Sequence, residues 1–175
     1  MRYVLVYGAI SGAVVIAVIV AGLAFDLPSH FQSMWFGYLV MLTALSLVFV
    51  GVKRFRDVEC GGVVGFGKAF TVGLGIAVVA GLVYVAGWEA YLATSGRDFM
   101  ADYVAVALAD MRATGASAAD LAKAEADMAW AIEAYRHPLQ RVAITFTEIF
   151  PVGLLMALIS ALVLRNPRIL PAQRA

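Results

Sequence analysis

The chain has 175 residues, of which 63% are hydrophobic and only 14% are charged, and its mean hydropathy is +0.88. Soluble globular chains are about 45–50% apolar and about 25% charged, so the excess apolar surface must face lipid. The length suits one domain and excludes a multidomain enzyme. With 13 basic and 12 acidic side chains, net charge gives no reason to expect nucleic acid as a partner. The composition predicts a single membrane domain over residues 1–175.

Four stretches are long and apolar enough to cross a bilayer, whose core of about 30 Å needs about 20 helical residues. They cover residues 4–25, 34–52, 69–93 and 142–164. The first stretch has an alternative as a signal peptide, but its apolar run exceeds the usual length of about 7–15 residues, which favours a retained helix. The prediction is an all-α fold, an integral membrane four-helix bundle.

The distribution of basic residues predicts the orientation. Eight Lys or Arg side chains fall in the N-terminus, the second connection and the C-terminus, and five fall on the other side. Both termini are therefore expected in the cytoplasm, with residues 26–33 and 95–140 outside. Cys60, the single cysteine, then lies on the reducing side, and alone it excludes an intramolecular disulfide.

The polar segment 95–140 is predicted to be a periplasmic helical hairpin between the third and fourth spans. Ser95 is expected to cap its first helix, and Thr114-Gly115 to end it. Ser117 is expected to cap the second helix, and His137-Pro138 to stop it. Two amphipathic helices result, packed on each other or on the membrane surface.

Two motifs have ordinary structural interpretations. The string 62–68 has the spacing of a phosphate-binding loop, but Ala69 stands where Ser or Thr should hold magnesium and no buried strand precedes it. His30 and His137 are about a hundred residues apart and lack metal-ligand spacing. We therefore expect neither a metal nor another cofactor.

Basic and small residues also form patterns. A basic cluster flanks the glycine-rich connection, and each of its side chains would attract anionic lipid by about 1 kcal/mol; a specific headgroup site there stays open. Small residues recur at four-residue steps in the first and third spans, which favours close helix packing within the chain over an oligomer seam. The basic cluster is Lys53, Arg54, Arg56 and Lys68; the small residues are Gly8, Gly12, Gly73, Ala77 and Gly81.

Glu148 is an acid inside the fourth span, about 9 Å beyond its start. Such a group costs about 2.5–3.5 kcal/mol in lipid, so it is expected to face the bundle, protonated or hydrogen-bonded. Helical spacing puts Arg141 and Thr145 on the same face, and Pro151 removes a backbone hydrogen bond nearby. Glu89 enters from the end of the third span as a further candidate. A structural role for Glu148 is favoured over transport or catalysis.

Several short motifs, in their order along the chain, resemble one family. They are Tyr7-Gly8 with Gly12, the stretch 51–57, Gly62 with 66–70, Tyr84 with Trp88-Glu89, and 148–153. In this order they are similar to the bacterial membrane family called domain of unknown function 4199. The resemblance covers nearly the whole chain apart from the hairpin. It implies a four-span protein of the bacterial inner membrane and supplies no reaction or catalytic residue.

Three functions follow as hypotheses. The favoured one is a non-enzymatic scaffold, accessory subunit or envelope factor, whose partners are membrane lipids and a second copy or another membrane protein. The second is a small oligomeric transporter or proton-coupled permease that uses Glu148. The third is an intramembrane lipid-modifying enzyme with Glu148 and Glu89 as acid and base. An exposed apolar face on the hairpin would favour the first, and a polar cavity reaching Glu148 would favour the second.

Overall fold

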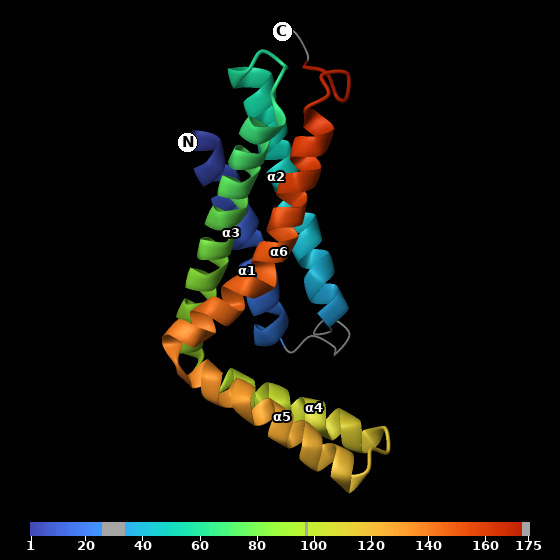
Figure 1. The fold of residues 1–175 in the computed structure, drawn as a ribbon. Helices are drawn as coiled ribbons and strands as arrows, with labels where there is room; N and C mark the ends of the chain where they lie inside the picture. The colour runs from blue at the N-terminus through green and yellow to red at the C-terminus, as the bar shows by residue number, and fades with distance from the viewer. Residues whose placement is uncertain (26–33, 97, 173–175) are drawn as a thin grey trace. The chain divides into compact units, whose positions relative to one another are not determined.

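The structure, a computed structural model, describes residues 1–25, 34–96 and 98–172. Within these ranges the chain forms six helices and no strand (Figure 1). Four of the helices are long and apolar enough to cross a membrane, which confirms the predicted all-helical class and the four candidate spans. The predicted loop 26–33, with His30, lies outside the described residues. The helices are α1 (Arg2–Ala24), α2 (Met34–Glu59), α3 (Phe66–Ser95), α4 (Phe99–Ala113), α5 (Ala118–Arg136) and α6 (Pro138–Leu164).

The long helices extend beyond the apolar stretches that predict them. Helix α2 continues seven residues past Val52, because backbone hydrogen bonding does not require apolar side chains and the Lys53–Asp57 pair at i,i+4 supports the last turns. Helix α6 starts at Pro138, which suits the first helical position because proline lacks only a hydrogen bond donor that is unused there. The predicted stop at His137 is confirmed, since this residue caps the end of α5.

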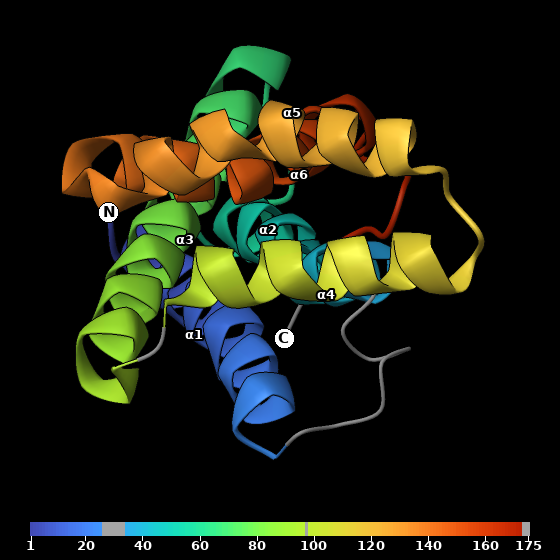
Figure 2. The same cartoon turned by 90° about the horizontal axis from the view of Figure 1, so that it is seen from below.

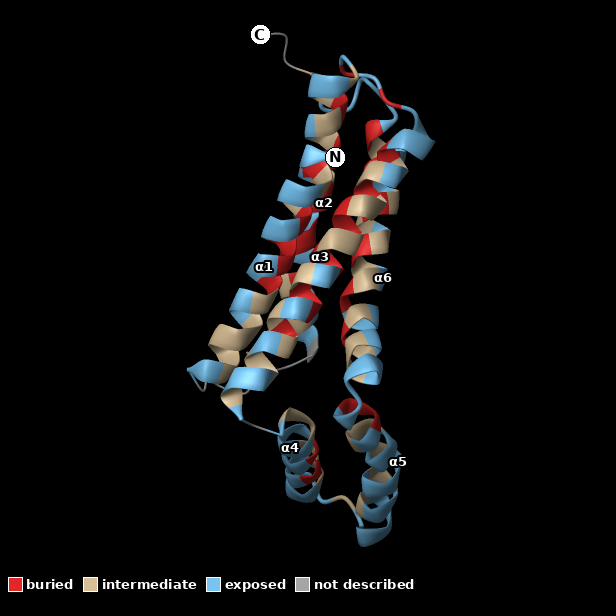
Figure 3. Ribbon diagram, turned by 90° about the vertical axis from the view of Figure 1, so that its left-hand side faces the viewer, coloured by how far each residue is buried: buried red, intermediate tan, exposed pale blue. Residues whose placement is uncertain are grey.

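The chain divides into two compact units, residues 1–88 with 146–175, and residues 89–145. In the first unit α1 packs on α2, and buried positions line the facing sides of the helices while exposed positions line the outer sides (Figure 3). Its core includes Leu45, Val48, Ile76, Ile149 and Ala157.

Glycine sets how closely the helices of the first unit approach. A Cβ atom added at Gly12 of α1 would lie 2.4 Å from the carbonyl oxygen of Ala80 in α3. One added at Gly153 of α6 would lie 2.8 Å from the Cβ of Ala77 in α3. Such short distances leave no room for a side chain, so α3 meets α1 backbone to backbone at Gly12 and packs its Ala77 methyl group on the backbone of α6 at Gly153. The predicted packing of small residues within the chain is confirmed.

Contacts at one end of the first unit join the start of α1 to the last turns of α2, and the segment after α6 to the α2–α3 connection. The Tyr3 hydroxyl donates to Glu59 Oε1 at 3.1 Å, and the Tyr3 ring meets the Phe55 ring edge-on at 6.0 Å. The segment that follows α6 reaches the α2–α3 connection directly after these turns, where a Cβ added at Gly62 would lie 3.1 Å from the Ala172 Cβ. The start of α1 and the segment after α6 therefore lie at the same end of the unit.

In the second unit α4 and α5 lie side by side (Figure 2), and the Phe99 and Tyr135 rings lie 6.1 Å apart. Ser117 caps α5 by accepting the Asp120 backbone N–H at 3.2 Å, as predicted. The predicted cap Ser95 is wrong. It is the last residue of α3; Gly96 then turns the chain with φ of +64°, and Asp98 caps α4 by accepting from the Ala101 N–H.

Candidate functional site

Glu148 is an exposed residue of α6, and its carboxylate reaches the buried Tyr84 of α3. Its carboxylate Oε2 accepts from the Tyr84 hydroxyl at 3.5 Å, beyond the usual O–H···O range of about 2.5–3.0 Å. The small residues of α6 explain this placement. Gly153 and Ala157 turn toward α3, and Glu148 lies about 140° around the helix from Gly153 at about 100° per residue.

Thr145 differs from Glu148 in its surroundings, although the sequence places them on one face. It continues the buried four-residue row of Ile149, Gly153 and Ala157, and its side chain is buried. Its Oγ1 has no hydrogen-bond partner among the described residues. Pro151 is exposed and sits within a continuous helix. The residues that the sequence places near Glu148 therefore have different surroundings, because Thr145 is buried whereas Glu148 and Pro151 are exposed.

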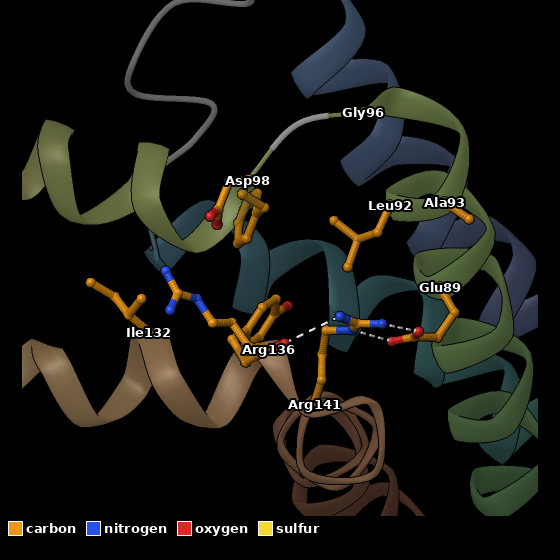
Figure 4. Close-up of a pocket in the computed structure, with 10 residues that line it drawn as sticks. Glu89, Leu92, Ala93, Gly96, Asp98, Ile132, Arg136 and Arg141 are labelled. Carbon is orange, nitrogen blue, oxygen red and sulfur yellow. Dashed lines mark hydrogen bonds and ion pairs between the residues drawn. The ribbon is translucent and has the colours of Figure 1, made fainter.

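Arg141 and Glu89 form a two-point ion pair in the second unit (Figure 4). Arg141 Nε donates to Glu89 Oε1 at 2.7 Å, and Nη2 donates to Oε2 at 2.5 Å. Arg141 Nη1 also donates to the Tyr135 carbonyl at 3.1 Å, and the guanidinium carbon lies 5.9 Å from the Tyr135 ring centroid. The side chains are only 20% and 28% exposed. The fork geometry of arginine fits a carboxylate in this way, and both Glu89 oxygens are used.

This ion pair forms one wall of a cavity of about 420 Å³ in the second unit. Leu92, Phe99 and Ile132 supply apolar and aromatic walls, and Asp98 and Arg136 add a second pair of opposite charges (Figure 4). Glu148 does not line it. The only sequence feature that points to this cavity is a pair of opposite charges, Glu89 near the end of the third predicted span and Arg141 just before the fourth.

Arg56 is fully buried, unlike an arginine that meets lipid headgroups. Its Nε donates to Asp57 Oδ1 at 2.7 Å, and its Nη1 and Nη2 donate to the carbonyls of Ile169 and Leu170 at 3.0 and 2.5 Å. Lys53 also pairs with Asp57, at 2.6 Å. These contacts hold the segment after α6 against the end of α2.

The other two members of the predicted basic cluster are exposed, Arg54 on α2 and Lys68 on the first turn of α3. Lys68 Nζ lies 5.4 Å from the Phe55 ring centroid, a cation–π distance. Contact with lipid headgroups thus stays a prediction for Arg54 and Lys68, whereas the charges of Lys53 and Arg56 are paired within the protein.

His137 is the histidine that the structure describes, and it has an acidic neighbour on its own helix. His137 Nε2 lies 3.4 Å from Glu133 Oε1 on α5. In the part of the chain that the structure describes, no three His, Cys, Asp or Glu side chains gather as a metal site would require.

Comparison with known families identifies the family of the chain. The model of one family, described as Protein of unknown function (DUF4199), matches residues 6–166. The chain belongs to this family. The DUF4199 match confirms the resemblance read from the short motifs, and it spans Arg56, Glu89, Arg141 and Glu148. No curated protein and no solved structure matches the chain significantly. The backbone carbonyls that bind Arg56, at Ile169 and Leu170, lie beyond the residues matched to DUF4199.

Proposed function

We propose that this DUF4199 protein is a non-enzymatic scaffold or accessory subunit of the bacterial inner membrane. Helices α1, α2, α3 and α6 cross the bilayer as a four-helix bundle, both termini lie in the cytoplasm, and α4 and α5 form a periplasmic hairpin that docks a partner protein. The four candidate spans are 23 to 30 residues long, enough for a core that needs about 20. The contacts at one end of the first unit support termini on one side.

The observation that carries the docking role is the exposure of large apolar side chains on the two short helices. Tyr103 and Val106 of α4 are 54% and 63% exposed, and Trp130 of α5 is 72% exposed. Exposed aromatic and aliphatic side chains with a polar surround are typical of interaction sites. The segment from Asp98 to Arg136 carries seven acidic and three basic side chains, which disfavours an anionic lipid surface as the occupant. A protein with an apolar groove and a basic rim fits better.

The orientation is tested by labelling single cysteines from outside intact cells in a Cys60→Ala background. Ala119→Cys, on the first turn of α5, should react, and Val63→Cys, in the α2–α3 connection, should react only after permeabilisation. Both positions are exposed, and neither has a positive φ or a capping role. Labelling of both from the same side would refute the topology.

Docking is tested by placing a photo-reactive residue at Trp130 and, as a matched control, at the exposed Glu125 of the same helix. In native membranes Trp130 should give one discrete protein adduct that Glu125 does not give. Val106→Ser should weaken the Trp130 adduct if both side chains serve one docking surface. Lipid adducts alone at Trp130 would contradict a protein partner.

Transport is the second candidate, because Glu148, an exposed residue, carries a carboxyl group within a candidate span. A polar pathway would have to reach this carboxyl. The cavity lined by Glu89 and Arg141 does not include Glu148, so the scaffold role has the better support. The pairing of both Glu89 oxygens with Arg141 likewise disfavours the enzyme hypothesis, which needs Glu89 as an acid or base.

A further inference from the structure

The exposed side of α6 carries a seam with one polar member. Glu148, Leu155, Ile159 and Leu162 are exposed, and the half-buried Val152 lies between them. The intervals from Glu148 onward are four, three, four and three residues, which is the spacing of the contact positions in a left-handed pair of helices. The spacing therefore describes a surface shaped for another helix, in addition to the buried row that faces α3.

Glu148 makes this seam unsuited to lipid. If α6 crosses the membrane, as the proposed function requires, the exposed residue Glu148 meets hydrocarbon, and among the described residues its carboxyl has one long contact, to Tyr84 at 3.5 Å. Polar groups in the membrane usually face protein or water because an unpaired one is costly. Another protein helix or water must therefore cover the carboxyl.

We infer that a second copy of this chain covers the seam, with α6 packed on α6 about a two-fold axis and the two Glu148 carboxyls facing each other. The four apolar stretches contain no Lys or Arg, so no cation of the chain can neutralise Glu148 within the membrane. A protonated carboxyl both donates and accepts a hydrogen bond. Such a group is complementary to itself, and a two-fold axis brings identical groups together.

The apolar members of the seam provide the rest of the contact. In parallel copies, Leu155 meets Leu155, and Leu162 meets Leu162, because residues near a two-fold axis face their own counterparts. Helix pairs in lipid associate through packing and interhelical hydrogen bonds, so one shared polar contact and a regular seam are the two terms expected to favour a dimer.

Disulfide cross-linking of single cysteines in native membranes tests the seam, in a Cys60→Ala background. Leu155→Cys and Leu162→Cys should form covalent dimers at least about ten times as readily as two exposed controls on other helices, Leu42→Cys on α2 and Leu82→Cys on α3. All four variants keep Glu148. Equal cross-linking at seam and control positions would overturn the proposal.

The role of Glu148 is tested with Leu155→Cys as the reporter. Glu148→Gln should keep the dimer, because an amide also donates and accepts, whereas Glu148→Leu should weaken association by about 3- to 30-fold, the range expected for an interhelical polar contact. Equal association of the Gln and Leu variants would refute the carboxyl pairing.

Other occupants give distinct results. A different protein captured at Leu155 in place of a second copy would overturn the proposal. So would a monomeric mass in lipid nanodiscs together with modification of Glu148 by a water-soluble carbodiimide, which would support a water pathway. Failure of the proposed topology is recognised separately, by the labelling of Ala119→Cys and Val63→Cys.

Discussion

The two compact units of the molecule use different interactions for the same purpose of fixing helices to one another. In residues 1–88 and 146–175, helices approach closely at glycines, backbone to backbone at Gly12 and backbone to the Ala77 methyl group at Gly153. In residues 89–145, the Glu89–Arg141 ion pair and the caps at Asp98 and Ser117 fix the ends of the helices. The difference follows from the solvent expected around each unit.

Lipid offers no hydrophobic force between helices, so close packing must supply the attraction. Water competes for hydrogen bonds, so a polar contact helps only where it is partly shielded or completes a helix end. Mutations should therefore be most harmful where they separate the backbones of the first unit, and milder where they remove polar contacts of the second.

The largest effect is expected from Gly12→Leu. A Cβ at this position would lie 2.4 Å from the Ala80 carbonyl oxygen and 2.9 Å from the Val83 Cβ, and backbone atoms cannot rotate away as a side chain can. The loss should exceed the about 1–3 kcal/mol typical of overpacked cores, leaving little folded protein after detergent extraction. Gly22→Leu on the same helix is the control, because no atom lies within 4 Å of its added Cβ. Equal thermal stability of the two variants would contradict backbone contact.

Asp57→Asn should have the next largest effect, through the buried Arg56 in the first unit. It leaves a buried guanidinium without its anion, which costs about 3 kcal/mol or more. Arg56→Met should cost less, since Asp57 keeps Lys53 at 2.6 Å. Thermal unfolding in a fixed detergent measures both. Arg54→Met, which changes an exposed neighbour, should stay within about 0.5 kcal/mol of the wild type. A larger loss for Arg56→Met than for Asp57→Asn would contradict this account.

A double-mutant cycle on Glu89 and Arg141 should give a coupling of about 1–2 kcal/mol, because the pair is two-pronged and mostly shielded. The matched control is Glu133 with Arg136 on α5, whose side chains are 63% and 65% exposed at 3.5 Å; its coupling should be at most about 0.5 kcal/mol. Comparable couplings would show that shielding does not distinguish the two pairs.

Local patterns account for what the sequence predicts correctly. Apolar runs of about 20 residues identify the four long helices, and turn residues place the break between α4 and α5 at residues 114–117. Both signals come from neighbours along the chain. The small-residue rows also predict contact between helices, because glycine at a four-residue step has few other uses in a membrane helix.

Distant pairing accounts for what the sequence does not reveal. Glu89 and Arg141 are 52 positions apart, and Arg56 contacts a carbonyl 113 positions away. Neither separation matches a helical or strand repeat, so no sequence pattern predicts these contacts. The exposure of Glu148 depends on how α6 rotates about its axis. A buried row on α6 predicts this rotation: it consists of Thr145, Ile149, Gly153 and Ala157. The small residues of the row face α3, so Glu148, which is not in the row, lies on another side of the helix.

The smallest effect is expected at the start of α4, where sequence and structure assign different caps. Asp98→Ala removes the acceptor for the Ala101 N–H and should weaken the first turn of α4 by about 1 kcal/mol. Ser95→Ala, the cap that the sequence predicts, should change it by much less, because the Ser95 hydroxyl donates within α3, to the Leu92 carbonyl at 3.4 Å. Amide hydrogen exchange at residues 100–102 measures the opening of this turn, and a cost of about 1 kcal/mol corresponds to roughly fivefold faster exchange. Faster exchange in Ser95→Ala than in Asp98→Ala would return the cap to Ser95. Because both variants leave the Glu89–Arg141 pair intact, the comparison separates the capping of α4 from the effect of the ion pair that lines the same cavity.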